Sequence, residues 1–411
     1  MTSTLEPDRT TSYTEQYGLD TGLIPVSGYA SQDYYDREID RVFKRTWLSI
    51  GRTVQIPKNG DYFVKNLVFA KTSILVARGR DGVIRAFHNV CTHRCNELAW
   101  NERGNARRLQ CGFHGWTFGL DGALVSVPDE ESFFDLDKSA FGLTPVACEV
   151  WEGYIFINLA PEPPETLTEY LGGHLDKFEG YPFQEFTRTY DYVGVVNCNW
   201  KIARDAFAEN YHLPTVHRYL FKKAYTSPEN PYNHNFAYSN TKYHGQHSIY
   251  INPEYQPSPL EALAFGLSGM DSIMVKPEDC DELRVPGMNP LGRPDWSGEQ
   301  VQIFPNTIML MFVGFSMWFT FTPLGVDKCL MEMQQAVRPH QNAKQRWAQE
   351  VANTTFQFSA LEDFSTLERT QKVIASGARK HFVLQDQEVQ VRLLHHWIQQ
   401  MAGPYPVEWA R

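Results

Sequence analysis

The spacing of apolar residues predicts a helix close to the N-terminus, preceded by a polar segment. From Ser31, a residue type that caps helices well, to Phe43, apolar positions recur at helical spacing. Residues 1 to about 30 have a polar character and predict an extended arm. The arm and the helix, residues 1–45, are expected to pack on the larger domain described below.

A β-rich segment follows, because short apolar runs alternate with tight-turn signals. The runs at 73–77 and 83–87 flank the dipeptide Asp81-Gly82, and Asp121-Gly122 repeats the same turn chemistry. Residues 151–158 read as the closing strand of this segment. The proline-rich run at 161–164 then predicts a domain boundary.

The second half of the chain mixes long helical patterns with buried strands. Residues 307–323 are the most apolar stretch, but they are too short for a comfortable membrane span and predict one or two buried strands. Residues 219–300 have few periodic stretches and predict either loops of a substrate channel or packing between subunits. Long helices are predicted over 341–376, ended by Gly377, and over 385–401.

Composition and charge narrow the class of protein. The 411 residues are enough for two domains, and 38 basic against 48 acidic residues give a net charge of -10, with no basic run that would bind nucleic acid. Seven cysteines without disulfide-scaffold spacing, and an N-terminus without a signal-peptide pattern, predict a reducing, cytoplasmic setting. Neither nucleic acid nor a membrane is an expected partner.

Two pairs of metal-ligand residues stand in the β-rich segment. Cys91-x-His93 and Cys111-x-x-His114 combine two thiolates with two imidazoles, a set that suits either tetrahedral zinc or a Rieske [2Fe-2S] cluster. Each pair lies in a loop flanked by aromatic and strand-like residues, which is typical of two hairpin tips. Structural zinc sites more often pair one such loop with a helix, so the surroundings favour the Rieske cluster, with His93 and His114 on one iron.

A second constellation lies downstream, where His212 and His217 follow the acidic residues Asp205 and Glu209. Together with the Cys/His pairs, this pattern strongly resembles the Rieske non-haem iron oxygenases, the alpha subunits of ring-hydroxylating and related oxygenases. The resemblance implies an α+β chain. Its parts are a small all-β Rieske [2Fe-2S] domain over 46–160 and a larger helix-grip catalytic domain, an antiparallel sheet with helices, over 161–411.

The resemblance also implies a mononuclear iron site. On a regular helix the five-residue step from His212 to His217 would turn the two imidazoles roughly 140° apart, so the helix must be distorted, and Pro214 is the expected break. The third ligand implied by the family's C-terminal helix is Asp363, with Glu362 as the fallback. Such a set of two histidines and one carboxylate leaves positions open for dioxygen.

Acidic residues beside the iron ligands have implied roles of their own. Glu209, three residues before His212 and so on the same helix face, is implied to link His212 to the cluster histidine His114 of the next protomer. Asp205 is the competing bridge and otherwise faces the pocket. Expected pocket walls are listed by their position relative to the ligands: Ala206, Leu213 and Ser359.

Cys95 departs from the family pattern, which commonly has glycine at this position. The second pair offers it no disulfide mate, because Gly112 and Phe113 stand there. We therefore expect Cys95 to be an inert buried thiol.

The expected function is that of a terminal oxygenase, a mono- or dioxygenase that takes electrons from NAD(P)H through a reductase, with or without a ferredoxin. The expected substrate is a small aromatic or polycyclic molecule, as in aromatic hydrocarbon catabolism. The alternative is a monooxygenase acting on a quaternary amine or on N- or O-methyl groups. The resemblance implies a homotrimer, with or without a beta subunit. Two rival classes are an electron-carrying Rieske protein without oxygenase activity and a zinc scaffold.

Overall fold

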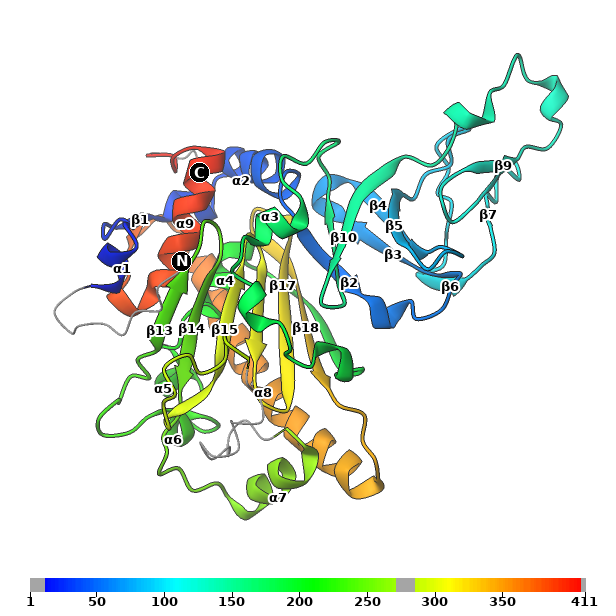
Figure 1. The fold of residues 1–411 in the computed structure, drawn as a ribbon. Helices are drawn as coiled ribbons and strands as arrows, with labels where there is room; N and C mark the ends of the chain where they lie inside the picture. The colour runs from blue at the N-terminus through cyan, green and yellow to red at the C-terminus, as the bar shows by residue number, and fades with distance from the viewer. Residues whose placement is uncertain (1–11, 271–284, 408–411) are drawn as a thin grey trace. The chain divides into compact units, whose positions relative to one another are not determined.

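The computed structural model describes residues 12–270 and 285–407 and divides the chain into two compact units. The smaller unit comprises Ile39–Leu167, and the larger comprises residues 1–38 and 168–411. Both contain antiparallel sheets. The α-helices longer than five residues that the structure describes belong to the larger unit (Figure 1). The predicted α+β class is confirmed, while the predicted limits at residues 46 and 160 stay a prediction.

The smaller unit is built from two antiparallel sheets. One has seven strands in the order β2-β11-β10-β5-β4-β3-β6, and the other has three in the order β7-β8-β9. The strands are β2 (Leu48–Arg52), β3 (Asp61–Leu67), β4 (Thr72–Arg78), β5 (Ile84–His88), β6 (Arg103–Asn105), β7 (Leu109–Gln110), β8 (Thr117–Phe118), β9 (Leu124–Ser126), β10 (Pro145–Trp151) and β11 (Tyr154–Asn158).

The turn signals of the sequence lie where they were predicted in this unit. Asp81-Gly82 joins β4 to β5, which pair as antiparallel neighbours, and Asp121-Gly122 joins β8 to β9. Gly82 and Gly122 have φ of 80° and 89°, a conformation that glycine adopts without steric cost. The Cys/His pairs lie in other loops of this unit. Cys91 and His93 follow β5, and Cys111 and His114 lie between β7 and β8.

The larger unit is organised around a seven-stranded antiparallel sheet in the order β12-β18-β17-β16-β15-β14-β13. The strands are β12 (Arg188–Val196), β13 (Phe236–Asn240), β14 (Gly245–Tyr250), β15 (Trp296–Ile303), β16 (Thr307–Met311), β17 (Phe315–Gly325) and β18 (Lys328–Val337). The apolar stretch 307–323 thus forms two neighbouring buried strands, as predicted. Residues 219–300 contain more regular structure than predicted, because β13, β14 and most of β15 lie there; residues 271–284 lie outside the described part.

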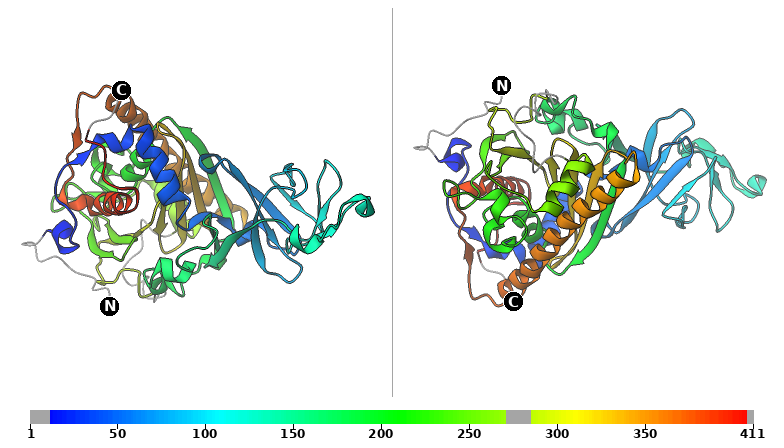
Figure 2. Two further views of the ribbon diagram at one scale, coloured as in Figure 1. Left: turned by 90° about the horizontal axis from the view of Figure 1, so that it is seen from above. Right: turned by 90° about the horizontal axis from the view of Figure 1, so that it is seen from below.

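Helices flank this sheet, a short one in front of the strands in the view of Figure 1 and the longest one behind them (Figures 1 and 2). They are α3 (Leu167–Leu171), α4 (Trp200–Ala206), α5 (Leu213–Val216), α6 (Lys222–Tyr225), α7 (Pro259–Ser268), α8 (Ala343–Ile374) and α9 (Val389–Ala402). The long helix α8 begins at the side-chain cap Asn342 and ends before Gly377, whose φ is 65°. Helix α7 packs beside it (Figure 2).

The N-terminal segment differs from the extended arm that its polarity predicted. Residues 1–11 lie outside the described part, but the chain then forms α1 (Tyr13–Gln16), a short strand β1 (Ile24–Pro25) paired with β19 (His381–Phe382), and α2 (Gln32–Glu38). Side chains such as those of Tyr13 and Ile24 are buried. The sparse apolar residues of this segment suffice to pack it against the C-terminal part of the chain.

A buried ion pair ties α2 to α4. The ammonium of Lys201 lies 2.7 Å from the carboxylate of Glu38, and both side chains are fully buried. The indole N–H of Trp200 donates to the same carboxylate at 3.1 Å. Because a buried charge is tolerated only with its partner, this pair fixes the start of the helix that leads to His212.

Candidate active site

The two Cys/His loops have the same backbone geometry. In the first, the N–H of Cys91 donates to the carbonyl of Asn96 at 2.8 Å; in the second, Cys111 donates to Trp116 at 2.8 Å. The thiols of Cys91 and Cys111 are buried and hydrogen-bonded to each other. The ring centroids of His93 and His114 lie 4.6 Å apart, and the side chain of His114 is exposed. Two thiols at the buried end and two imidazoles at the outer end fit the ligand set of a Rieske cluster.

Cys95 occupies a position that the backbone makes unfavourable for it. Its N–H donates to the carbonyl of Cys91, just as Gly115 donates to Cys111, so the two residues are equivalent in the two loops. Both have positive φ, 56° for Cys95 and 76° for Gly115. This left-handed conformation suits glycine and is sterically unfavourable for cysteine. The prediction of a buried thiol is wrong, because Cys95 is exposed.

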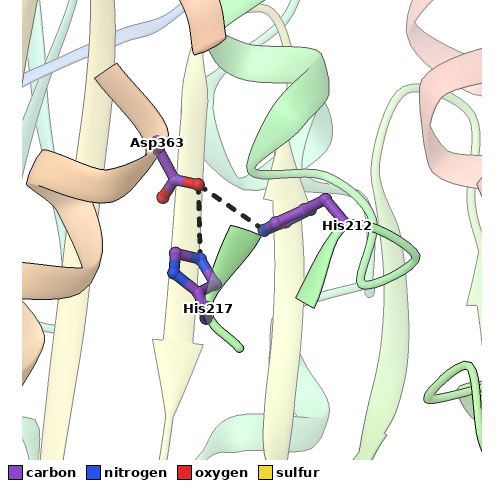
Figure 3. A group of neighbouring side chains, drawn as sticks. All are labelled: His212, His217 and Asp363. Atoms are coloured by element: carbon purple, nitrogen blue, oxygen red, sulfur yellow. Dashed lines mark ion pairs between the residues drawn. The ribbon is translucent and has the colours of Figure 1, made fainter. Parts of the chain in front are cut away.

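The structure brings together His212, His217 and Asp363, and one ligand atom from each lies within 4.8 Å of the others. Figure 3 shows the Asp363 carboxylate facing both imidazole rings. Its Oδ1 lies 3.7 Å from Nε2 of His212 and 3.2 Å from Nε2 of His217. All three side chains therefore present their ligand atoms to one point, and this donor set suits a ferrous ion.

The helix distortion needed for this convergence occurs earlier than predicted. Helix α4 ends at Ala206, and a separate short helix α5 begins at Leu213, with Pro214 inside its first turn. Pro214 is tolerated there because the first residues of a helix have no ladder bond to lose. The irregular segment between the two helices turns His212 towards His217.

Each of the two histidines has a second carboxylate behind its ring. Nδ1 of His212 lies 2.7 Å from Oε1 of Glu209, and Nδ1 of His217 lies 2.8 Å from Oε2 of Glu362. The predicted contact of Glu209 is present, although the residue lies outside any helix. Glu362, expected only as a fallback ligand, bonds the back of His217, and the sequence contained no signal for a pairing 145 residues apart.

These carboxylates change the proton affinity of the site. Burial disfavours a charged imidazole, but the carboxylate of Glu209 outweighs it and raises the pKa of His212 to about 9. A metal ion bound at Nε2 therefore has to displace a tightly held proton.

Asp205 lies away from the cavity, contrary to the prediction that it faces the pocket unless it forms the bridge. Its Oδ2 accepts a hydrogen bond from the hydroxyl of Tyr29 at 2.7 Å and lies 3.1 Å from Nε2 of His395. The other ring nitrogen of His395 bonds the hydroxyl of Tyr405. Since these partners come from the N- and C-terminal segments, Asp205 joins those segments to α4.

An apolar cavity of about 110 Å³ opens beside the three ligands. Leu213 and Ser359 line it as predicted, but Ala206 does not, because α4 ends there and the next residue, Phe207, takes the wall position. Its other apolar walls are Phe221, Ile249, Ile308, Leu310, Phe312, Met317, Phe319, Met333, Phe356 and Ala360. Sequence reasoning missed these residues, which meet only when the sheet and α8 pack together.

Comparison with protein families gives two matches along the chain. The model of the ring hydroxylating alpha subunit (catalytic domain) matches residues 183–403, and the model of the Rieske [2Fe-2S] domain matches residues 46–145. The first includes the two histidines and Asp363, and the second includes both Cys/His pairs.

Curated relatives match over part of their length. The glycine betaine monooxygenase oxygenase subunit of Pseudomonas aeruginosa is 33% identical over 199 residues, which are 48% of this chain and 46% of that protein. The biphenyl 2,3-dioxygenase subunit alpha of Rhodococcus jostii is 33% identical over 202 residues, 48% of this chain and 43% of that protein. The chain thus spans about half the length of the curated relatives it matches.

Solved structures share the fold at low identity. A quaternary ammonium Rieske monooxygenase has a TM-score of 0.72 at 18% identity, covering 98% of this chain and 100% of that one. Naphthalene 1,2-dioxygenase from Rhodococcus sp., bound to indole, has a TM-score of 0.71 at 21% identity, covering 93% and 95%. Within the described ranges, no helix combines the length and apolarity needed to cross a bilayer.

Proposed function

Because the chain belongs to the ring-hydroxylating alpha subunit family and carries a Rieske [2Fe-2S] domain, we propose that it is the terminal oxygenase of a multi-component system. The observation that carries the proposal is the convergence of His212, His217 and Asp363 beside an apolar cavity. When bound, the cluster would supply electrons and the mononuclear iron would activate dioxygen. An electron carrier would have no use for this second donor set.

Each ligand group has a proposed task in the two metal sites. Cys91 and Cys111 would hold one iron of the cluster, and His93 and His114 would hold the other. The exposed ring of His114 offers electrons a short path to or from a reductase or ferredoxin fed by NAD(P)H. His212, His217 and Asp363, which line the cavity, would hold the mononuclear iron.

The carboxylates behind the histidines orient them. A carboxylate that accepts from Nδ1–H fixes the tautomer in which Nε2 is the free donor to the metal. Glu362 does this for His217. Glu209 does it for His212 and, in the head-to-tail trimer that the family resemblance implies, links His212 to His114 of the partner subunit.

The cavity favours an apolar substrate. Its volume of about 110 Å³ is close to that of an apolar cavity of roughly 150 Å³ that binds benzene, so one ring or a group of similar size fits. Aromatic ring hydroxylation is therefore the proposed reaction. Phenylalanine rings on several sides favour a second candidate, a quaternary amine held by cation–π contacts. The described lining has no Lys or Arg that could pair with a carboxylate of the substrate. The proposed amine therefore carries no carboxylate group of its own.

Metal analysis and a single turnover test the proposal. The purified protein should contain about three irons and two acid-labile sulfides per chain, as one cluster plus one iron requires. The chemically reduced protein, mixed with ¹⁸O₂ and a panel of single-ring arenes and small quaternary amines, should yield a labelled product. Two irons per chain under iron-replete conditions, with no labelled product, would identify an electron carrier instead.

A further inference from the structure

Gln300 is a buried polar residue in the otherwise apolar sheet wall of the cavity. It lies in β15, and its register partner on β16 is Leu310, which in turn faces Met317 on β17. All three line the cavity, and Gln300 is only 3% exposed. A buried amide among apolar neighbours is costly unless its polar atoms are hydrogen-bonded.

One hydrogen bond fixes the orientation of this amide. The Nε2 group donates to the backbone carbonyl of Phe207 at 2.8 Å. A carbonyl oxygen can only accept, so the amide nitrogen must point towards Phe207 and Oε1 must point elsewhere. Within the described residues Oε1 has no hydrogen-bond partner. His247, opposite on β14, does not supply one, since neither of its ring nitrogens is bonded.

The remaining polar groups of the cavity already have partners inside the protein. The hydroxyl of Ser359 donates to the carbonyl of Phe356 at 2.8 Å, and that of Tyr225 is hydrogen-bonded to Ser297. Nδ2 of Asn210 donates to Oδ1 of Asn235 at 2.8 Å, and Asn210 stands two residues before the iron ligand His212. On the sheet wall of the cavity, away from the iron ligands, Gln300 Oε1 is thus the acceptor that stays available among the described residues.

We propose that Gln300 is a specificity-determining residue, and that the substrate is a ring-sized apolar molecule carrying one O–H or N–H donor, which bonds Oε1. This inference rests on the proposed function and names its substrate class. Pockets use a few fixed polar groups to orient apolar ligands, and a site built around such a bond discriminates against analogues that lack the donor. The bond would also fix which carbon of the ring faces His212 and His217.

Binding of two ligands of equal shape tests the proposal. Phenol and toluene differ by a hydroxyl in place of a methyl group, and sealed equilibrium dialysis against the holoenzyme gives both dissociation constants without requiring turnover. In Gln300→Met the ratio of phenol affinity to toluene affinity should fall about tenfold relative to wild type, because only phenol loses a hydrogen bond. Using the ratio removes the difference in hydrophobic transfer between the two ligands.

Controls separate this inference from the proposed function. Gln334→Met makes the same change on β18, where the amide bonds Asp191 away from the cavity, and should leave the ratio within twofold of wild type. Gln300→Leu provides a second reading if Gln300→Met fails to retain its mononuclear iron. An unchanged ratio in the Gln300 variants, or an equal fall in Gln334→Met, overturns the role of Gln300. Absence of labelled product from wild type overturns the proposed function instead.

Discussion

Glu362 provides a sharp test of how the iron site is held, because it contacts a ligand without being one. Its Oε2 lies 2.8 Å from Nδ1 of His217, while Nε2 of His217 faces Asp363 at 3.2 Å. Replacing Glu362 by leucine removes the acceptor but leaves all three ligand atoms. We expect iron to bind more weakly, because the imidazole loses its preferred tautomer and orientation.

The size of the effect follows from the burial of the pair. Loss of such a partner typically weakens metal affinity by about 10- to 100-fold, or about 1.4–2.7 kcal/mol. The side chain of His217 is 4% exposed, but that of Glu362 is 29% exposed, so water can partly replace the carboxylate. The lower end, about tenfold, is expected for Glu362→Leu. Glu362→Gln still accepts from Nδ1–H and should lose less than about threefold.

The assay is a competition titration of the apo iron site with Fe(II) and a chelator under anaerobic conditions, with cluster absorbance as the internal standard. Glu368→Leu is the matched control, since Glu368 lies on the same helix but accepts hydrogen bonds from Asn197. Its iron affinity should equal that of wild type. Wild-type affinity in Glu362→Leu would refute the orienting role of this carboxylate, and total loss of iron would instead make it a ligand.

Four further substitutions test other parts of the structure. His114→Cys should lower the cluster potential or lose the cluster, since imidazole ligands raise it, and an unchanged Rieske spectrum would exclude His114 as a ligand. Asp363→Ala should abolish mononuclear iron while sparing cluster absorbance, and normal iron occupancy would move the carboxylate ligand elsewhere. Glu209→Gln should keep both metal centres but lose cluster oxidation coupled to turnover; near-wild-type turnover would remove its bridging role. Lys201→Met should destabilise the larger unit by about 3–5 kcal/mol in denaturant unfolding, because it leaves Glu38 charged and buried, and a smaller loss would show that water reaches that carboxylate.

Local sequence predicted the parts of the structure that depend on short spacings. The turns at Asp81-Gly82 and Asp121-Gly122, the helix ended by Gly377, and the two Cys/His loops are each specified by residues within a few positions of one another. Ligand chemistry constrains these loops further, because few metal sites use two thiolates and two imidazoles.

The predictions for the pocket side of α4 failed because they extended a regular helix beyond its end. Ala206 and Asp205 were assigned to the pocket as though α4 continued towards the histidines, but α4 ends at Ala206. The contact of Glu209 with His212 survives because three residues of irregular chain also bring the two side chains together. Glu362 and Gln300 acquire their surroundings only from tertiary packing, which no local spacing encodes.

The side chains around the iron site carry an excess of negative charge, which affects both the proton on His212 and the binding of a metal ion. Asp363, Glu209 and Glu362 place three carboxylates around two imidazoles, and the side chains of Asp363 and Glu209 are only 6% and 11% exposed. Such an excess of negative charge is unfavourable in a buried site unless a cation offsets it. In the metal-free protein the proton on His212, held with a pKa of about 9, provides part of that offset. A divalent ion offsets more charge from the same position, so its binding releases this proton and is strengthened by carboxylates that never touch it.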